Sequence, residues 1–524
     1  MRKFLCTTVL GLMAFSALTL AAQTSAPRVI HADMNAVSGP RSTAYNFCVG
    51  ADHGGMLLRE ANQQQLALAR QELGFRYIRF HGIFLDDLEA YKEVDGKPVY
   101  NWTKIDTVYD VIRKAGMKPF IELGFMPNDL ASGKQTIFYW KGNVTQPKDY
   151  KKWGDFIEAF ARHLQQRYGD AEVATWYFEV WNEPNLNKNG FFVGEQSDYF
   201  HLYDVSAEAI KRVNPAYRVG GPSTAGAAWV PDLIAHAANN KVPLDFVSTH
   251  TYGVDGGFLD EKGQSDQKLS GSPDAVVGDM RNVRAQVAAS AMPKLPVHFT
   301  EWNTSYSPGD PVHDTYINAS FILDKIKRAE GVVDSLSYWT YTDLFEEAGP
   351  QPEPFHGGFG LLNREGIRKP TYFAYKFLYD LRPTELVNSD KNSWLTRDES
   401  GNFSALIWDF TAPKQDKSDG PYYRQLHPST PIAPVKLTVA GLAPGKSYAM
   451  HLTRVGYKSN DAYSRYIEWG LPGKLSDEQL KELKSLAAGE PAVSSQTAAS
   501  DGSLTVELPM NSNDIVFVEI EQPK

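Results

Sequence analysis

Two glutamates stand at the ends of apolar, strand-like runs, each with an asparagine beside it. Glu183 lies in residues 178–184 (FEVWNEP), and Glu301 lies in residues 297–303 (VHFTEWN). A run that passes from aromatic and β-branched residues into polar ones is typical of a buried strand that emerges at the rim of a sheet. Two carboxyl groups that face one cavity are the minimum requirement for hydrolysis of a glycosidic bond. Glu183 and Glu301 are therefore the candidate catalytic residues.

This chemistry makes different demands on the two groups. The transition state carries positive charge at the anomeric carbon and the leaving oxygen needs a proton, so one carboxyl group must be ionised and the other protonated. A separation of about 5–5.5 Å lets the ionised group attack directly and retain configuration, whereas about 6.5–9.5 Å leaves room for water and inverts it. Burial and the negative charge of the other glutamate would raise the pKa of the protonated group.

The segments that would position these glutamates alternate between strand-like and helix-like patterns. Residues 63–73, 149–168 and 314–330 have the apolar spacing of helices with one buried face. Because parallel strands need crossover helices, the pattern predicts an α/β fold, a (β/α)₈ TIM barrel over residues 44–385, in preference to a doubly wound open sheet. The eight strand-like runs are 46–50, 77–80, 119–125, 175–181, 218–222, 245–250, 296–301 and 335–341.

In such a barrel the active residues follow the strands at the C-terminal face, where Glu183 would end the fourth strand and Glu301 the seventh. Side chains alternate between the two faces of a strand. A buried Arg79 needs a carboxylate partner, and Glu179 or Glu122 could provide it, in a structural or in a catalytic role. The sets expected to face the interior are Tyr77, Arg79 and His81; Glu179, Trp181 and Glu183; and Phe246, Ser248, His250 and Tyr252.

The pattern changes after residue 385, where helical periodicity gives way to short strands separated by turn residues. Residues 386–524 therefore predict an accessory antiparallel β-sandwich, interrupted by a helix at about 476–486. Residues 28–40 are also strand-like and are expected to complete this domain from the other side of the barrel. The expected strands of the sandwich are 402–410, 435–438, 447–454, 504–508 and 515–520.

The N-terminus has the pattern of a targeting segment. A basic start, an apolar run and small residues near position 22 predict a signal peptide over residues 1–22, and hence export to the periplasm or the extracellular space. The mature chain keeps one cysteine, Cys48, which cannot form an intrachain disulfide. No other long apolar stretch suggests a membrane span, and the net charge of −9 argues against nucleic acid as a partner.

Several motifs together resemble family 39 of the glycoside hydrolases, which contains β-xylosidases and α-L-iduronidases. The family belongs to a large clan of retaining (β/α)₈ glycosidases, and its layout of a barrel plus a β-sandwich matches the change of pattern after residue 385. The motifs are 79–84 (RFHGIF), 178–186 (FEVWNEPNL), 249–253 (THTYG), 299–306 (FTEWNTSY) and 355–361 (FHGGFGL).

The resemblance implies a role for individual residues. Glu183 is similar to the family's acid/base and Glu301 to its nucleophile, while Asn182 matches the asparagine that holds the sugar 2-hydroxyl. The other expected contacts with substrate come from His81, His250 and Tyr252, from Trp339 as an aromatic floor, and from Glu346 or Glu347 as a grip on the outer hydroxyls. From the residues alone, Trp339 could equally be core, and His81 and His250 could be structural.

The activity implied by the resemblance is that of an exo-acting retaining β-D-xylosidase that releases xylose from xylo-oligosaccharides. Its alternatives are an α-L-arabinosidase, an iduronidase-like exo-enzyme, an endo-glycanase, or a carbohydrate-binding protein that has lost catalysis. The mechanism needs no cofactor and no metal. We find no H-E-x-x-H, P-loop, C-x-x-C or G-x-S-x-G motif in the sequence.

Overall fold

The computed structural model describes residues 26–187 and 190–522. The signal peptide expected over residues 1–22 lies outside these described residues. Across the part of the chain that the structure describes, no helix has both the length and the apolar composition needed to cross a membrane.

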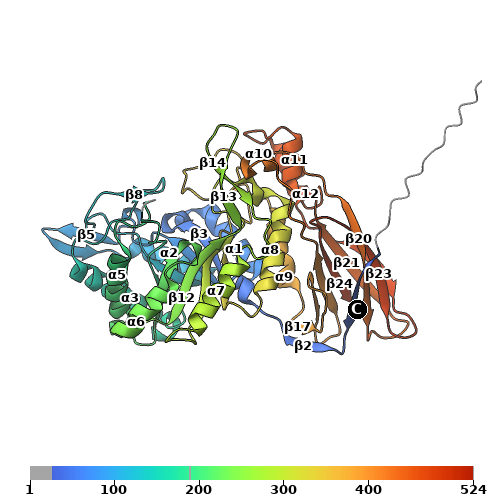
Figure 1. Ribbon diagram of the computed structural model, residues 1–524, viewed down its shortest axis with the longest axis horizontal. Coiled ribbons are helices and arrows are strands. Elements are labelled where there is room, and N and C mark those ends of the chain that lie inside the picture. The colour runs from blue at the N-terminus through green and yellow to red at the C-terminus, as the bar shows by residue number, and fades with distance from the viewer. Residues whose placement is uncertain (1–25, 188–189, 523–524) are drawn as a thin grey trace, which may run out of the picture.

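Eight parallel strands close into a barrel, as the sequence predicts, and the helices that connect them form its outer layer (Figure 1). Each expected strand is present, with bounds that differ by at most a few residues from those expected. Going round the barrel in chain order, the strands are β3 (Cys48–His53), β4 (Tyr77–His81), β7 (Lys118–Leu123), β10 (Tyr177–Val180), β11 (Arg218–Thr224), β12 (Phe246–Tyr252), β15 (Val297–Asn303) and β16 (Ser335–Tyr338).

The outer helices form where apolar residues recur at helical spacing. In α3 (Tyr150–Tyr168), the side chain of Asp149 caps the first turn by accepting from the backbone N–H of Lys152, and the apolar positions of one face, such as Phe156 and Phe160, are fully buried. The remaining barrel helices are α1 (Glu60–Leu73), α2 (Thr103–Lys114), α4 (Asp170–Val173), α5 (Gln196–Val213), α6 (Val230–Asn240), α7 (Val277–Ala288), α8 (Tyr316–Ala329) and α9 (Pro370–Asp380).

Side chains fill the barrel interior in layers of different polarity. At the N-terminal end, Phe120, Tyr177 and Phe246 pack around His298, whose pKa is lowered to about 4 by burial. This aromatic layer closes the barrel from below. The next layer toward the C-terminal face is charged, so polar chemistry is confined to the upper half of the barrel.

Three short hairpins extend from the loops of the barrel. The first hairpin follows the second barrel strand, and the second hairpin follows the third barrel strand. The last hairpin follows the sixth barrel strand and rises above the barrel (Figure 1). They are β5 (Tyr91–Val94) with β6 (Lys97–Tyr100), β8 (Thr136–Ile137) with β9 (Gly142–Asn143), and β13 (Val254–Leu259) with β14 (Ser265–Leu269).

Two further sheets share a separate apolar core and lie beside the barrel (Figure 1). All five expected strands are present, and the chain N-terminal to the barrel adds one strand to each sheet. The three-stranded sheet has the order β1 (Arg28–Asp33), β20 (Pro431–Ala440), β23 (Leu504–Asn511). The seven-stranded sheet has the order β2 (Val37–Pro40), β17 (Thr384–Leu386), β18 (Ser393–Arg397), β19 (Phe403–Trp408), β24 (Ile515–Glu521), β21 (Ser447–Val455), β22 (Ala492–Thr497).

One pair of strands departs from the antiparallel arrangement of this domain, because β1 runs parallel to β20. These strands come from opposite ends of the chain, so no hairpin fixes their relative direction. The helices of this domain are α10 (Asp419–Tyr423), α11 (Ala462–Glu468) and α12 (Asp477–Leu486). Of these, α12 lies at the position expected from the sequence.

One face of the seven-stranded sheet packs against the barrel, and its buried apolar side chains belong to the barrel's core cluster. Helix α8 is buried on nearly every side, although its sequence suggested a single buried face, because the accessory domain covers the face that would otherwise meet water. At this junction the rings of Phe377 on α9 and Phe517 on β24 are stacked, with their centroids 5.0 Å apart. Both side chains belong to the same buried cluster as the barrel core.

Because of this shared core, we expect Phe517→Ala to destabilise the whole molecule. Truncation of a buried phenylalanine typically lowers the free energy of unfolding by about 3–5 kcal/mol. Urea denaturation followed by tryptophan fluorescence should show the loss in a single transition that includes the barrel. Val493→Ala, at a side chain that is 65 % exposed, is the control and should change the unfolding free energy by less than about 0.5 kcal/mol. A separate early transition, with the barrel transition unchanged, would contradict the shared core.

Candidate active site

Glu183 reaches the cavity through a sharp turn after strand β10. The strand ends at Val180, and both Trp181 (φ +69°) and Glu183 (φ +45°) adopt left-handed backbone conformations. Such conformations are costly for residues other than glycine and persist where the surrounding structure fixes them. Here the N–H of Glu183 donates to the carbonyl of Ser223 on β11, at 2.8 Å. The turn thus holds the Glu183 carboxyl group over the mouth of the barrel.

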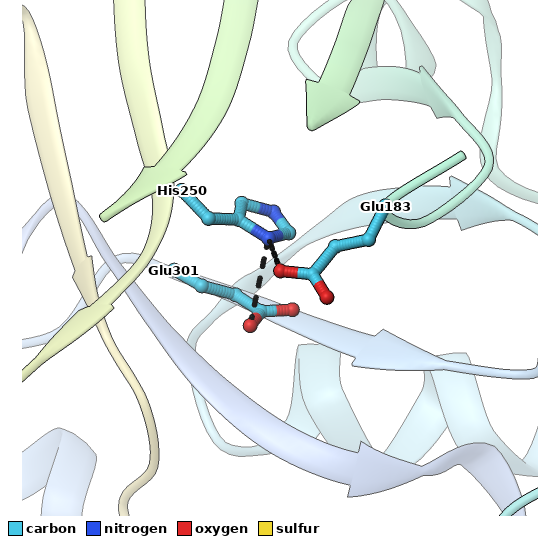
Figure 2. A group of neighbouring side chains, drawn as sticks. All are labelled: Glu183, His250 and Glu301. Carbon is cyan, nitrogen blue, oxygen red and sulfur yellow. Dashed lines mark hydrogen bonds and ion pairs between the residues drawn. The ribbon is translucent and has the colours of Figure 1, made fainter. Parts of the chain in front are cut away.

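Glu301 approaches the same point from β15, and His250 of β12 contacts both carboxyl groups from one side (Figure 2). Nδ1 of His250 is 2.9 Å from Oε1 of Glu183 and 3.6 Å from Oε2 of Glu301. One oxygen of each glutamate lies within 4.8 Å of the other. This separation fits the spacing of about 5–5.5 Å that permits direct attack and is short of the wider spacing of about 6.5–9.5 Å that accommodates a water molecule.

The Glu301 carboxylate is fixed from both sides. Nη1 of Arg79 donates to its Oε1 at 2.7 Å, and the hydroxyl of Tyr252 donates to its Oε2 at 2.7 Å. Burial, with Glu301 nearby, raises the pKa of Tyr252 well above its usual value, so this hydroxyl keeps its proton. Two donors of this kind suit an ionised carboxylate and orient it within the cavity.

Arg79 lies at the centre of a buried ionic cluster. Its fully buried guanidinium donates to Glu179 at 2.5 Å and lies 3.0 Å from Glu122. Burial opposes the charge of Arg79, but Glu179, Glu122 and Glu301 outweigh it and raise the pKa. The same guanidinium donates to Asn182 Oδ1 at 2.9 Å, which draws this amide into the cavity. Arg79 therefore contacts a candidate catalytic group as well as two structural carboxylates.

The surroundings of Glu183 favour its protonated form. Burial raises the pKa of Glu183 to about 7, opposed by the positive charges of His81 and Arg79 and assisted by Glu122. We expected the negative charge of Glu301 to contribute to this rise in the pKa of Glu183, but the like charge that contributes is that of Glu122. Burial lowers the pKa of His250 to about 4, so the imidazole beside Glu183 is neutral at neutral pH. Among the residues that the structure describes, Glu183 thus has no cation in direct contact to hold it ionised.

A second cluster of polar side chains, centred on His81, occupies the opposite wall of the cavity. Burial opposes the charge of His81, but Glu122, Glu347 and Glu301 raise its pKa well above the usual value, so it is an imidazolium. Its Nδ1 is 2.7 Å from Glu122, and its Nε2 is 3.3 Å from Glu347. Burial also raises the pKa of Glu347 to about 7. The Trp339 ring lies beside that of His81, with centroids 4.8 Å apart, and is backed by Phe345 and Phe359.

The cavity above these groups has a volume of about 740 Å³, within the range of about 300–1,000 Å³ that is usual for small-molecule sites. Glu347 lines it, whereas Glu346 does not: its carboxylate turns away to form an ion pair with Arg59. The expectation that either glutamate could face the substrate is thereby resolved in favour of Glu347, and Glu346 is not part of the cavity wall.

The assumption that side chains alternate strictly along the fourth barrel strand placed one residue on the wrong side. Trp181, expected on the interior side with Glu179, lies against Phe125 and donates its indole N–H to the carbonyl of Phe191. Asn182 takes the inward position in its stead. Alternation holds only while the strand continues, and the left-handed turn begins directly after Val180.

Two residues around the site were not predicted from the sequence. Ser223, whose Oγ accepts from Arg79 at 3.1 Å, follows Pro222 beyond the end of the expected fifth strand. Asp279, on the cavity wall, lies on α7 and not at the end of a strand. The position after a strand end was the signal for Ser223, but nothing in the local sequence distinguishes Asp279.

Glu183, His250 and Glu301 also have the spacing of a metal-binding group, since their ligand atoms all lie within 4.8 Å of one another. The guanidinium of Arg79 already lies within hydrogen-bonding distance of Glu301, and its positive charge would repel a metal ion bound at the same carboxylate. The arrangement is better suited to acid/base and nucleophilic chemistry by the carboxyl groups themselves.

Comparison with known proteins gives a consistent result. A family model described as "Glycosyl hydrolases family 39" matches residues 28–505. A β-xylosidase from Geobacillus stearothermophilus is 39 % identical over 487 residues, which cover 91 % of this chain and 92 % of that protein. The crystal structure of a monomeric β-xylosidase from Caulobacter crescentus CB15 superposes with a TM-score of 0.92 at 50 % identity, covering 95 % of this chain and all of that one. A family 39 enzyme from Xanthomonas axonopodis pv. citri gives a TM-score of 0.93 at 50 % identity, covering 95 % of this chain and 98 % of that one.

We expect Arg79→Met to destabilise the fold strongly, because the three carboxylates around the guanidinium would lose their shared counter-ion. Breaking a buried ion pair typically lowers the free energy of unfolding by about 3–5 kcal/mol, which urea denaturation measures directly. The matched control is Arg59→Met, whose ion pair with Glu346 is partly exposed and should contribute only about 0–1 kcal/mol. Equal losses in the two variants would contradict a central role for Arg79.

Proposed function

The chain belongs to family 39 of the glycosyl hydrolases, and from this premise we propose that it is an exo-acting retaining β-D-xylosidase with Glu301 as nucleophile and Glu183 as acid/base. The observation that carries this assignment is the pair of carboxyl groups, close enough for covalent attack but in contrasting environments. Glu301 accepts a hydrogen bond from the buried Arg79, whereas Glu183 is buried beside the neutral His250.

In the first step, Glu301 attacks the anomeric carbon while Glu183 gives its proton to the leaving oxygen. The product of this step is a glycosyl ester of Glu301 and a free leaving group. Arg79 and Tyr252 hold the attacking carboxylate in one orientation, so the geometry of attack is set before substrate binds. Asn182, positioned by Arg79, is placed to bond a hydroxyl of the reacting sugar.

In the second step, Glu183 removes a proton from water, which attacks the ester and releases the sugar with its original configuration. Glu183 is ionised after the first step, because it has given its proton to the leaving group. The same residue can then act as a base. His250 remains neutral through both steps and keeps Glu183 in position.

Two observations support a neutral pentose as the reacting sugar. The relatives of high identity and coverage are β-xylosidases. Among the described residues, the acidic side chains of the cavity wall are Glu183, Asp279 and Glu347, and the imidazolium of His81 is already paired with Glu122 and Glu347, an arrangement that disfavours binding of a uronate carboxylate. His81, Trp339 and Glu347 would grip the hydroxyls and the face of the sugar ring.

We also propose that the enzyme is exported, on the strength of the basic start and apolar run of residues 1–22. N-terminal sequencing of the protein recovered from the periplasm or the culture medium tests this. A start near residue 23 supports export, and an intact Met1 in the cytoplasm contradicts it.

Glu301→Gly should abolish turnover of 4-nitrophenyl β-D-xyloside, by a factor of about 10⁴ or more, because no group remains to attack the anomeric carbon. Azide added to this variant should restore part of the activity and give the α-xylosyl azide, since the small anion attacks from the vacated side. Glu346→Gly, outside the cavity, is the control and should keep most of the activity. Full activity in the Glu301 variant would remove it from the nucleophile role.

The pH profile should follow the protonation of Glu183. Its pKa is raised to about 7, and the proton is needed in the first step, so kcat/KM should fall as the pH rises through about 7. Glu183→Gln should lose this alkaline limb when assayed on a xyloside with an activated phenol as leaving group, which departs without protonation. An unchanged limb in the variant would assign the titration to another group.

A further inference from the structure

The cavity has two walls with different relations to the catalytic pair. His81 ends the second barrel strand and lies beside Glu301, and Glu347, from the loop after the eighth strand, lies beside His81. The other wall comes from the loops after the fifth, sixth and seventh strands and adjoins Glu183. Because Glu183 protonates the leaving oxygen, whatever is attached to that oxygen extends along this second wall.

The second wall holds one acidic side chain, Asp279, on the first turn of α7. Its Oδ2 accepts a hydrogen bond of 2.5 Å from the hydroxyl of Thr251 at the end of β12. Within the described chain this is the hydrogen bond that the Asp279 side chain makes, and the carboxylate does not cap its own helix. Asp279 lines the cavity, and among the described residues its Oδ1 accepts no hydrogen bond, so this oxygen can accept one from a ligand.

The space in front of Asp279 is open and bounded by an aromatic ring. Ala225 and Gly226 form the floor, and a Cβ built on Gly226 would meet no atom within 4 Å. Tyr306 stands at the outer edge with 58 % of its surface exposed. A carboxylate acceptor and an exposed aromatic ring that line the same cavity suit a sugar, which offers hydroxyl donors at the edge of its ring and C–H groups on the face.

We propose that Asp279, oriented by Thr251, binds a hydroxyl of the sugar in the leaving-group position and so selects oligosaccharides over other xylosides. This inference rests on the proposed function, since it assigns the second sugar of the same substrate. Tyr306 supplies the face against which this second ring packs. Asp279 does not take part in the chemical step.

The test compares two substrates that share the reacting xylose and differ in the leaving group. In xylobiose the leaving group is a second xylose, which carries hydroxyls. In 4-nitrophenyl β-D-xyloside the leaving group is 4-nitrophenol, which lacks the hydroxyls of a sugar ring. Asp279→Ala should lower kcat/KM for xylobiose by about tenfold or more, chiefly through a higher KM, as expected for the loss of a charge-assisted hydrogen bond. The value for the aryl xyloside should change by less than about twofold.

Two further variants separate binding from folding. Asp279→Asn keeps the shape and an acceptor for Thr251, and should lower kcat/KM for xylobiose in the same direction if Asp279→Ala does not fold. Asp274→Ala is the matched control, because this nearby aspartate is exposed and pairs with Arg281 away from the cavity. It should leave both substrates unchanged.

Equal losses on both substrates, or no loss on xylobiose, would overturn the role of Asp279 while leaving the proposed function standing. A wild-type chain that hydrolyses neither substrate would instead overturn the proposed function, and this inference with it.

Discussion

The charge of Arg79, buried on the barrel axis, is the constraint on which the rest of the site depends. Glu122 on β7 and Glu179 on β10 are direct partners in the parallel register, so two like charges stand side by side in a medium of low dielectric. The guanidinium bonds Glu179, lies within 3.0 Å of Glu122 and reaches up to Glu301. The interaction that makes the barrel interior stable is thus the one that fixes the attacking group.

The same arrangement separates the chemical tasks of the two glutamates. Glu301 has cationic and hydroxyl donors within hydrogen-bonding distance, whereas Glu183 has a neutral imidazole as its direct partner. Burial raises the pKa of Glu183, and the positive charge of Arg79 opposes this rise without overcoming it. The left-handed turn after β10 is needed for this contrast, because it lifts Glu183 away from the charged layer and brings Asn182 toward it.

The barrel, the accessory sheets and the two glutamates could be predicted from the sequence, since each is encoded locally. Strand runs that end in Glu, and helices with one apolar stripe, specify their own structure wherever they fold. What could not be predicted depends on contacts between distant segments. The full burial of α8 requires the accessory sheets, and the parallel direction of β1 requires β20. Glu346 turns away from the cavity, unlike Glu347, because it pairs with Arg59. Asn182 faces inward in place of Trp181 because of the turn that begins after Val180.

The central claim is that the Glu183 and Glu301 carboxyl groups face the same anomeric carbon at a distance that permits covalent attack. Proton NMR of a fresh reaction with 4-nitrophenyl β-D-xyloside measures this most directly, because the anomeric configuration of the first xylose released can be read before mutarotation. The account predicts that β-xylose appears first and α-xylose follows slowly. Initial release of α-xylose would mean a single displacement by water and would contradict the account.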